Sequence, residues 1–116
     1  AAMTERSSGV VQGTLEMLIL RTLTLEPMHG YGIGTRLSQI TDGVLKVNGG
    51  SLFPALTRLE RNRLIKGEWR SSENSRRAKF YSITAQGRAK LKRETRDWEI
   101  HSDAIARVLR ASLAER

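Results

Sequence analysis

The chain of 116 residues contains no cysteine, which excludes disulfide bonds and thiolate metal sites. Its two histidines are too few to hold a metal ion unless carboxylates supply the other ligands, so no cofactor is expected. The longest purely apolar run, Met17 to Leu20, is far too short to span a membrane, and the N-terminal residues lack the apolar core of a signal peptide. We therefore expect a protein of the reducing cytoplasm that contacts no membrane.

Arrangements of side chains that are typical of enzymes are also missing. The alternating glycines from Gly30 to Gly34 resemble part of a dinucleotide-binding loop, but they follow Pro-Met-His rather than a strand. The triplet His101-Ser102-Asp103 lies on a predicted helix, where adjacent side chains point in different directions and cannot form a proton relay. No catalytic function is expected.

What the sequence has in excess is positive charge, and one segment holds nearly all of it. The net charge is +8, and the stretch from Arg58 to Arg93 holds twelve Lys and Arg against three Glu, which is +9 and leaves −1 for the remainder. A concentrated basic patch is typical of a protein that binds a polyanion, whereas a solvated basic face is the alternative interpretation. The same segment is predicted to contain a helix and a hairpin, and this motif favours a nucleic acid as the polyanion.

Three helices are predicted in the first half of the chain. The first begins at Gly13, and the second ends at Asp42-Gly43. Both are predicted because apolar residues recur in them at helical spacing and turn residues follow them. The third lies between Asn48 and Asn62. Its cap is either Asn48 or Ser51, and the sequence does not decide between them.

The periodicity then changes from that of a helix to that of a strand. Residues 65–70 and 79–84 are predicted to be strands, and the polar, basic residues 71–77 between them a turn, so together they form a hairpin wing. Three helices, a wing and a further helix are typical of a winged helix-turn-helix domain, which we predict over residues 13–84. Residues 1–12 are polar and predicted to form a flexible arm. The expected fold class is mostly α with a small β-hairpin.

From the predicted cap Thr84, one helix is expected to cover residues 85–116. A heptad-like seam runs along it at spacings of four and three, through Leu91, Thr95, Trp98, Ser102, Ile105, Leu109 and Ser112. A domain this small cannot cover so long a helix, so we expect a second copy of the chain to do so. The predicted homodimer interface, which includes the first helix, comprises Leu15, Leu18, Leu91, Trp98, Ile105 and Leu109.

Side chains on the polar stripe of the third helix suit contact with DNA. Thr57, Arg58 and Arg61 lie opposite its apolar positions, and arginine can donate two hydrogen bonds to one guanine. The alternative is a solvated face paired with Glu60, or contact with phosphate only. In the wing, the groups suited to phosphate or minor-groove contact are those of Asn74, Ser75, Arg76, Arg77 and Lys79, and a solubilising turn is the alternative.

Four segments carry a resemblance to a known family: Gly13–Leu20, Met28–Ile33, Gly50–Glu60 and Asn74–Thr84. In this order they resemble the PadR family of bacterial transcriptional regulators, in its short subtype with a single C-terminal helix. The resemblance covers roughly residues 13–91. It implies a homodimer that binds double-stranded DNA, represses at inverted-repeat operators and, in some members, is released by a small effector.

The resemblance also implies which residues lie at the DNA. These are Ser51, Phe53 and Pro54 in the third helix, together with Arg76, Arg77 and Lys79 in the wing. Family members usually have tyrosine where Phe53 stands. The hydroxyl and its hydrogen bond to phosphate are therefore lost here, and packing is the alternative role of Phe53.

Trp98, midway along the C-terminal helix, has two interpretations. Two copies of the helix would bring two indoles together beside the small side chains of Thr95 and Ser102, which leaves space for a flat aromatic effector. The resemblance agrees, since certain family members bind aromatic compounds at the dimer interface. A buried, dry interface anchor is the commoner role of such a tryptophan.

Two functions compete on these observations. The first is a sequence-specific transcriptional regulator, expected to be a repressor. The alternative is a sequence-neutral architectural protein, which uses the same charge without reading bases. Only the first keeps its preference for one site in an excess of random DNA.

Overall fold

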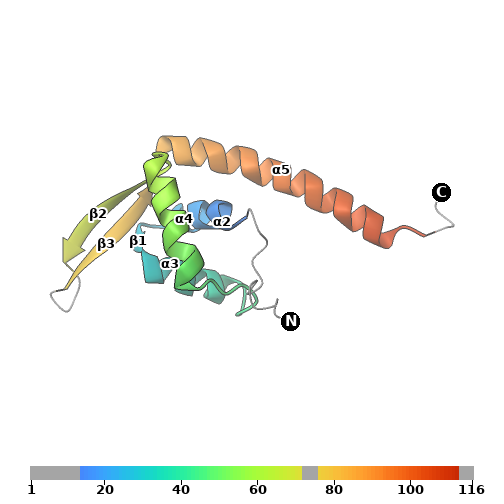
Figure 1. Ribbon diagram of the computed structural model, residues 1–116. Coiled ribbons are helices and arrows are strands. Elements are labelled where there is room, and N and C mark those ends of the chain that lie inside the picture. The colour runs from blue at the N-terminus through green and yellow to red at the C-terminus, as the bar shows by residue number, and fades with distance from the viewer. Residues whose placement is uncertain (1–13, 72–75, 113–116) are drawn as a thin grey trace.

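The computed structural model describes residues 14–71 and 76–112 (Figure 1). The predicted arm at residues 1–12 and the predicted contacts Asn74 and Ser75 lie outside these described residues. No helix within them is long and apolar enough to cross a membrane. Their elements follow the order α2 (Leu15–Leu23), β1 (Met28–His29), α3 (Gly30–Ile40), α4 (Gly49–Arg61), β2 (Ile65–Ser71), β3 (Arg77–Ile83) and α5 (Ala85–Arg110).

The core lies where α2, α3 and α4 pack against one another and against the sheet. Its fully buried apolar side chains come from all of these layers and include Ile19, Leu20, Ile33, Leu56, Leu59 and Ile65. On the helices they recur at helical spacing, and burial stabilises the fold by roughly 25 cal/mol per Å² of apolar surface. The prediction of a mostly α, winged-helix fold with a C-terminal helix is confirmed.

Capping side chains determine where the helices begin. The side-chain oxygen of Asn48 accepts a hydrogen bond of 3.0 Å from the backbone N–H of Ser51, so Asn48 rather than Ser51 caps α4. The imidazole of His29 accepts from the N–H of Gly32 at 3.1 Å and caps α3. Thr84 caps α5, as predicted.

The sheet contains a strand that the sequence does not predict. β2 and β3 form the predicted antiparallel wing, in which Ile65 lies opposite Ile83. β1, which is only Met28 and His29, pairs with the other edge of β3, so the strand order is β1-β3-β2. Two residues are too few to show a strand periodicity, so in the sequence this segment appears only as a break between helices. The pairing ties the wing to the segment between α2 and α3.

The two ends of α5 have different surroundings (Figure 1). Its beginning packs on α2, and Leu91, predicted at a dimer interface, is only 8% exposed and belongs to the core of its own chain. The outer half of α5, from Trp98 to Arg110, extends away from the rest of the molecule. The helix ends at Arg110, where Ala111 takes an extended conformation, so within the described residues it is shorter than the predicted range 85–116.

Candidate nucleic-acid interface

The exposed face of α4 carries most of the predicted contacts. One side of the helix is buried through Leu52, Ala55, Leu56 and Leu59. The residues exposed on the remaining surface include Ser51, Pro54, Thr57, Arg58 and Arg61. α4 lies at the front of the view, beside the wing (Figure 1). Such a helix can enter the major groove without disturbing the core, because its buried side faces away from the DNA.

The two arginines of this face differ in their partners. Nε of Arg58 donates to a carboxylate oxygen of Glu16 in α2 at 2.8 Å. Among the described residues neither arginine pairs with Glu60, which binds Lys79 instead, whereas contact with phosphate only stays an alternative. Within residues 14–71 and 76–112, Arg61 forms no ion pair. Within these residues, a carboxylate therefore holds the guanidinium of Arg58 but not that of Arg61.

A second ion pair joins α4 to the wing. Nζ of Lys79 in β3 lies 2.9 Å from Oε1 of Glu60 and 5.6 Å from the ring centroid of Tyr81. The hydrogen bond to Glu60 raises the pKa of Lys79, and burial raises the pKa of Tyr81. Lys79 is thus a charged residue engaged between two elements, rather than a free side chain on the wing.

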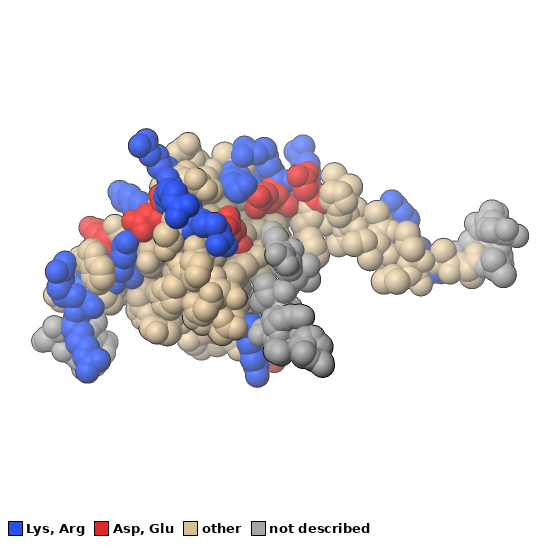
Figure 2. Space-filling model, viewed as in Figure 1, with Lys and Arg blue, Asp and Glu red and all other residues tan. Residues whose placement is uncertain are grey.

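The wing exposes its cations along the hairpin. Arg76 and Arg77 are both exposed, and the guanidinium of Arg77 lies 5.4 Å from the ring centroid of Trp69, which is itself exposed. Arg70 lies over Phe80 at 5.0 Å in the same way. Figure 2 shows Lys and Arg gathered over the wing and along the beginning of α5, with acidic side chains among them. Stacking on aromatic rings leaves guanidinium N–H groups available to phosphates.

Phe53 packs instead of projecting freely. Its ring stands edge-on to Tyr31 of α3, with ring centroids 5.3 Å apart. It also covers Gly30, where a Cβ would lie 2.5 Å from the ring, so glycine is required for this close approach. The sequence did not single out Tyr31, whose side chain is largely exposed next to α4. Its phenol is a hydrogen-bond donor, a group that the side chain of Phe53 lacks.

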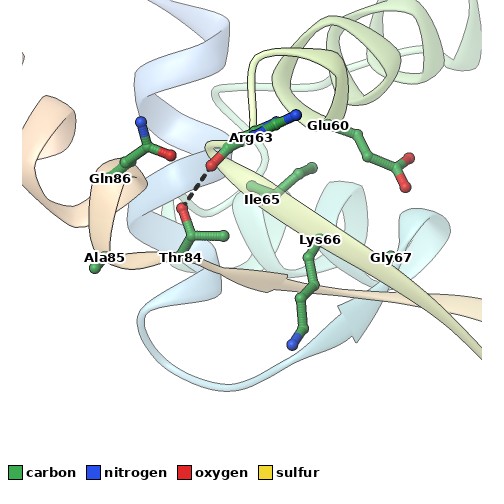
Figure 3. A pocket seen from close by; sticks show the side chains of 8 residues that line it. All are labelled: Glu60, Arg63, Ile65, Lys66, Gly67, Thr84, Ala85 and Gln86. Atoms are coloured by element: carbon green, nitrogen blue, oxygen red, sulfur yellow. Dashed lines mark hydrogen bonds between the residues drawn. The ribbon is translucent and has the colours of Figure 1, made fainter.

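One surface hollow lies where α4 ends and α5 begins (Figure 3). It has a volume of about 550 Å³ and is lined by Glu60, Arg63, Ile65, Lys66, Gly67, Thr84, Ala85 and Gln86. The hydroxyl of Thr84 donates to the carbonyl of Arg63 at 2.8 Å and joins the two segments at its wall. Trp98, the residue predicted to contact an effector, does not line this hollow.

Comparison with known proteins identifies the family. The model of the "Transcriptional regulator PadR-like family" matches residues 19–93, so the chain belongs to this family. A PadR-like transcriptional regulator from Bacillus cereus is 29% identical, with 87% of this chain and 96% of that chain covered and a TM-score of 0.74. A PadR family regulator from Eggerthella lenta is 30% identical, with 87% and 86% covered and a TM-score of 0.75. An uncharacterized protein from Lysinibacillus sphaericus is 26% identical over 91 residues, 78% of this chain and 84% of that protein.

Membership confirms the resemblance inferred from the four sequence segments. The protein is a DNA-binding transcriptional regulator with a winged-helix fold, and members of this family are not enzymes.

Proposed function

We propose that the protein is a sequence-specific, cytoplasmic repressor that binds an inverted-repeat operator as a homodimer. The observation that carries the proposal is the exposed face of α4, where Thr57, Arg58 and Arg61 lie on the opposite side from the buried leucines, next to a basic wing. A face that carries arginine can distinguish guanine by its two major-groove acceptors, whereas wing cations suit phosphates.

In this proposal the residues of α4 and the wing have separate tasks. Ser51, Pro54 and Thr57 border the bases, while Arg58 and Arg61 read them. Phe53 supports the helix by packing. The cations Arg76, Arg77 and Lys79, with Asn74 and Ser75 that precede them in the sequence, bind the sugar-phosphate backbone.

The homodimer would form through residues 85–116, with residues 13–84 as the DNA-binding domain. The outer half of α5 exposes Trp98 at 41%, Ile105 at 55% and Leu109 at 80%, an apolar stripe that the described residues leave largely uncovered. Leu15 and Leu18 on α2 are half-buried and border it in the proposed interface. A twofold pair of recognition helices about 34 Å apart reads two half-sites one helical turn apart, which requires an inverted repeat.

The proposal includes release from DNA by a flat aromatic effector that stacks on the paired Trp98 side chains. The exposed indole and the small side chains of Thr95 and Ser102 beside it support this role. In a Trp69→Phe variant only Trp98 fluoresces, so titration with planar aromatic compounds tests it. Saturable quenching together with release of DNA is expected. Blue-shifted emission that no compound changes would leave Trp98 as a dry interface anchor.

The decisive experiment is selection of bound duplexes from a random DNA pool with the full-length chain. A sequence-specific regulator enriches a palindrome and keeps preferring it when random DNA is in excess. An architectural protein enriches no sequence and loses all binding in parallel as salt rises. The second result would overturn the proposal.

A further inference from the structure

Besides the packing of their buried side chains, α4 and α2 are joined by an ion pair. Glu16 lies in the first turn of α2, and Arg58 lies in the last turn of α4. Nε of Arg58 donates to Oε2 of Glu16 at 2.8 Å. The side chain of Glu16 is 29% exposed and that of Arg58 is 50% exposed, so the pair lies at the protein surface, on the face of α4 that we propose binds DNA.

The carboxylate occupies only one part of the guanidinium. Among the described residues, neither terminal Nη group of Arg58 has a hydrogen-bond partner. These two nitrogens form the fork that can donate simultaneously to O6 and N7 of guanine. Glu16 therefore fixes the stem of the arginine and leaves the fork that reads a base available.

The binding of a surface arginine to a base depends on whether its side chain is already oriented before the DNA arrives. A free arginine side chain loses much of its rotamer freedom when it contacts a base, and this loss weakens binding. The bond to Glu16 restricts the side chain before DNA arrives, so less freedom is lost on contact. A partly exposed ion pair is weaker than a bidentate contact with guanine, so Glu16 does not withhold Arg58 from the DNA.

We propose that Glu16 is a positioning residue for DNA specificity: its carboxylate holds Arg58 in the orientation that reads one base pair. This inference rests on the proposed role of Arg58 in base readout. The negative charge of Glu16 repels the DNA backbone, and its contribution to discrimination between base pairs compensates for that repulsion.

The test compares Glu16→Gln, Glu16→Ala and Arg58→Ala in the full-length chain. Affinity is measured for the selected site, for its single-base-pair variants and for random duplex. Glu94→Gln is the matched control, because Glu94 forms a 2.8 Å ion pair with Lys90, is similarly exposed at 34%, and loses the same charge on substitution. Thermal unfolding verifies that each variant is folded.

Both Glu16 variants should bind random duplex slightly more tightly, because each removes one negative charge. Glu16→Ala should lower discrimination at one base pair by about tenfold, at the position where Arg58→Ala does. Glu16→Gln should retain part of that discrimination, since an amide oxygen still accepts from Nε. Adding Glu16→Ala to Arg58→Ala should cause no further loss.

Unchanged discrimination at every base pair in Glu16→Ala would overturn the inference and leave the proposed function intact. Increased discrimination would also overturn it, because Glu16 would then sequester Arg58. A wild-type chain that prefers no site would instead overturn the proposed function itself.

Discussion

The body of the molecule comprises α2 to β3 and α5 as far as Leu91. It differs from the outer half of α5 in how far its apolar side chains are buried. In the body, the large apolar side chains of the helices converge on one core, and Leu91 joins it. In the outer half, Trp98, Ile105 and Leu109 remain exposed on a helix that the body does not reach. The cations predicted to bind DNA belong to the body. The difference indicates that the proposed reading of DNA and the proposed dimerisation use separate regions of this chain.

The largest expected effect breaks the outer half alone. Ile105→Asp with Leu109→Asp should convert a dimer into a monomer, because two charges per copy enter an interface in which burial of these side chains contributes more than about 5 kcal/mol. Sedimentation at micromolar concentration measures the mass, and circular dichroism should show that the body stays folded. Leu25→Asp, at an exposed leucine of the body, is the control and should remain dimeric. A monomeric wild-type chain would contradict the proposed dimer.

The next effect breaks the contact that holds the beginning of α5 against the rest of the body. In Gly87→Ala, the new Cβ would lie 2.1 Å from the carbonyl oxygen of Leu64 and 2.8 Å from the side chain of Ile83. Either α5 shifts or β2 does, so the free energy of unfolding should fall by about 3 kcal/mol in urea denaturation. Gly34→Ala is the matched control: its Cβ meets nothing nearer than 3.9 Å, and alanine should stabilise that helix by up to about 1 kcal/mol. Equal midpoints for the two variants would refute this account of the contact at Gly87.

A third prediction tests the body without touching the outer half. Arg61→Ala should weaken binding to the selected site by roughly 1–3 kcal/mol and relax specificity at one base pair, because Arg61 has no carboxylate partner among the described residues. Fluorescence anisotropy measures the affinity for the selected site and the affinity for random DNA. Arg107→Ala, which removes the same charge from the outer half of α5, should leave specificity unchanged. Equal losses on cognate and random DNA would reduce Arg61 to a phosphate contact.

The wing should give a smaller and less specific effect. Arg76→Ala with Arg77→Ala should weaken binding to all sequences alike and reduce the slope of log affinity against log salt by about two, since two phosphate contacts are lost. Titrations at several salt concentrations measure this slope. If the slope of a folded double variant matches the wild type, the wing is only a solvated turn.

The smallest expected effect concerns the link between α4 and the wing at high pH. The pKa values of Lys79 and Tyr81 are raised in the folded chain, so above about pH 10 the unfolded chain holds fewer protons and stability falls as pH rises. Both contributions are fully present below that range. Tyr81→Phe should reduce the alkaline loss by less than about 1 kcal/mol, measured as urea midpoints at neutral and alkaline pH. A steeper loss in the variant would reverse the sign of this assignment.

Local patterns in the sequence were sufficient for most of the fold. Apolar residues at helical spacing marked α2, α3 and α4, and the change to strand periodicity marked the wing. Thr84 was recognised as a cap because capping is a contact between residues three apart. The choice between Asn48 and Ser51 required the backbone conformation, and the two-residue strand β1 required its partner β3.

The types of side chain at the candidate interface also followed from the sequence, but which side chains pair with one another did not. The sequence alone determined that a basic segment, a recognition helix and a wing coincide, because these depend on composition and local order. Only the tertiary structure decided that Glu16 holds Arg58, that Glu60 holds Lys79 and that Leu91 enters the core. These contacts join elements distant in sequence, as with Glu16 and Arg58, which are 42 positions apart, and no local periodicity encodes which distant side chain arrives beside another.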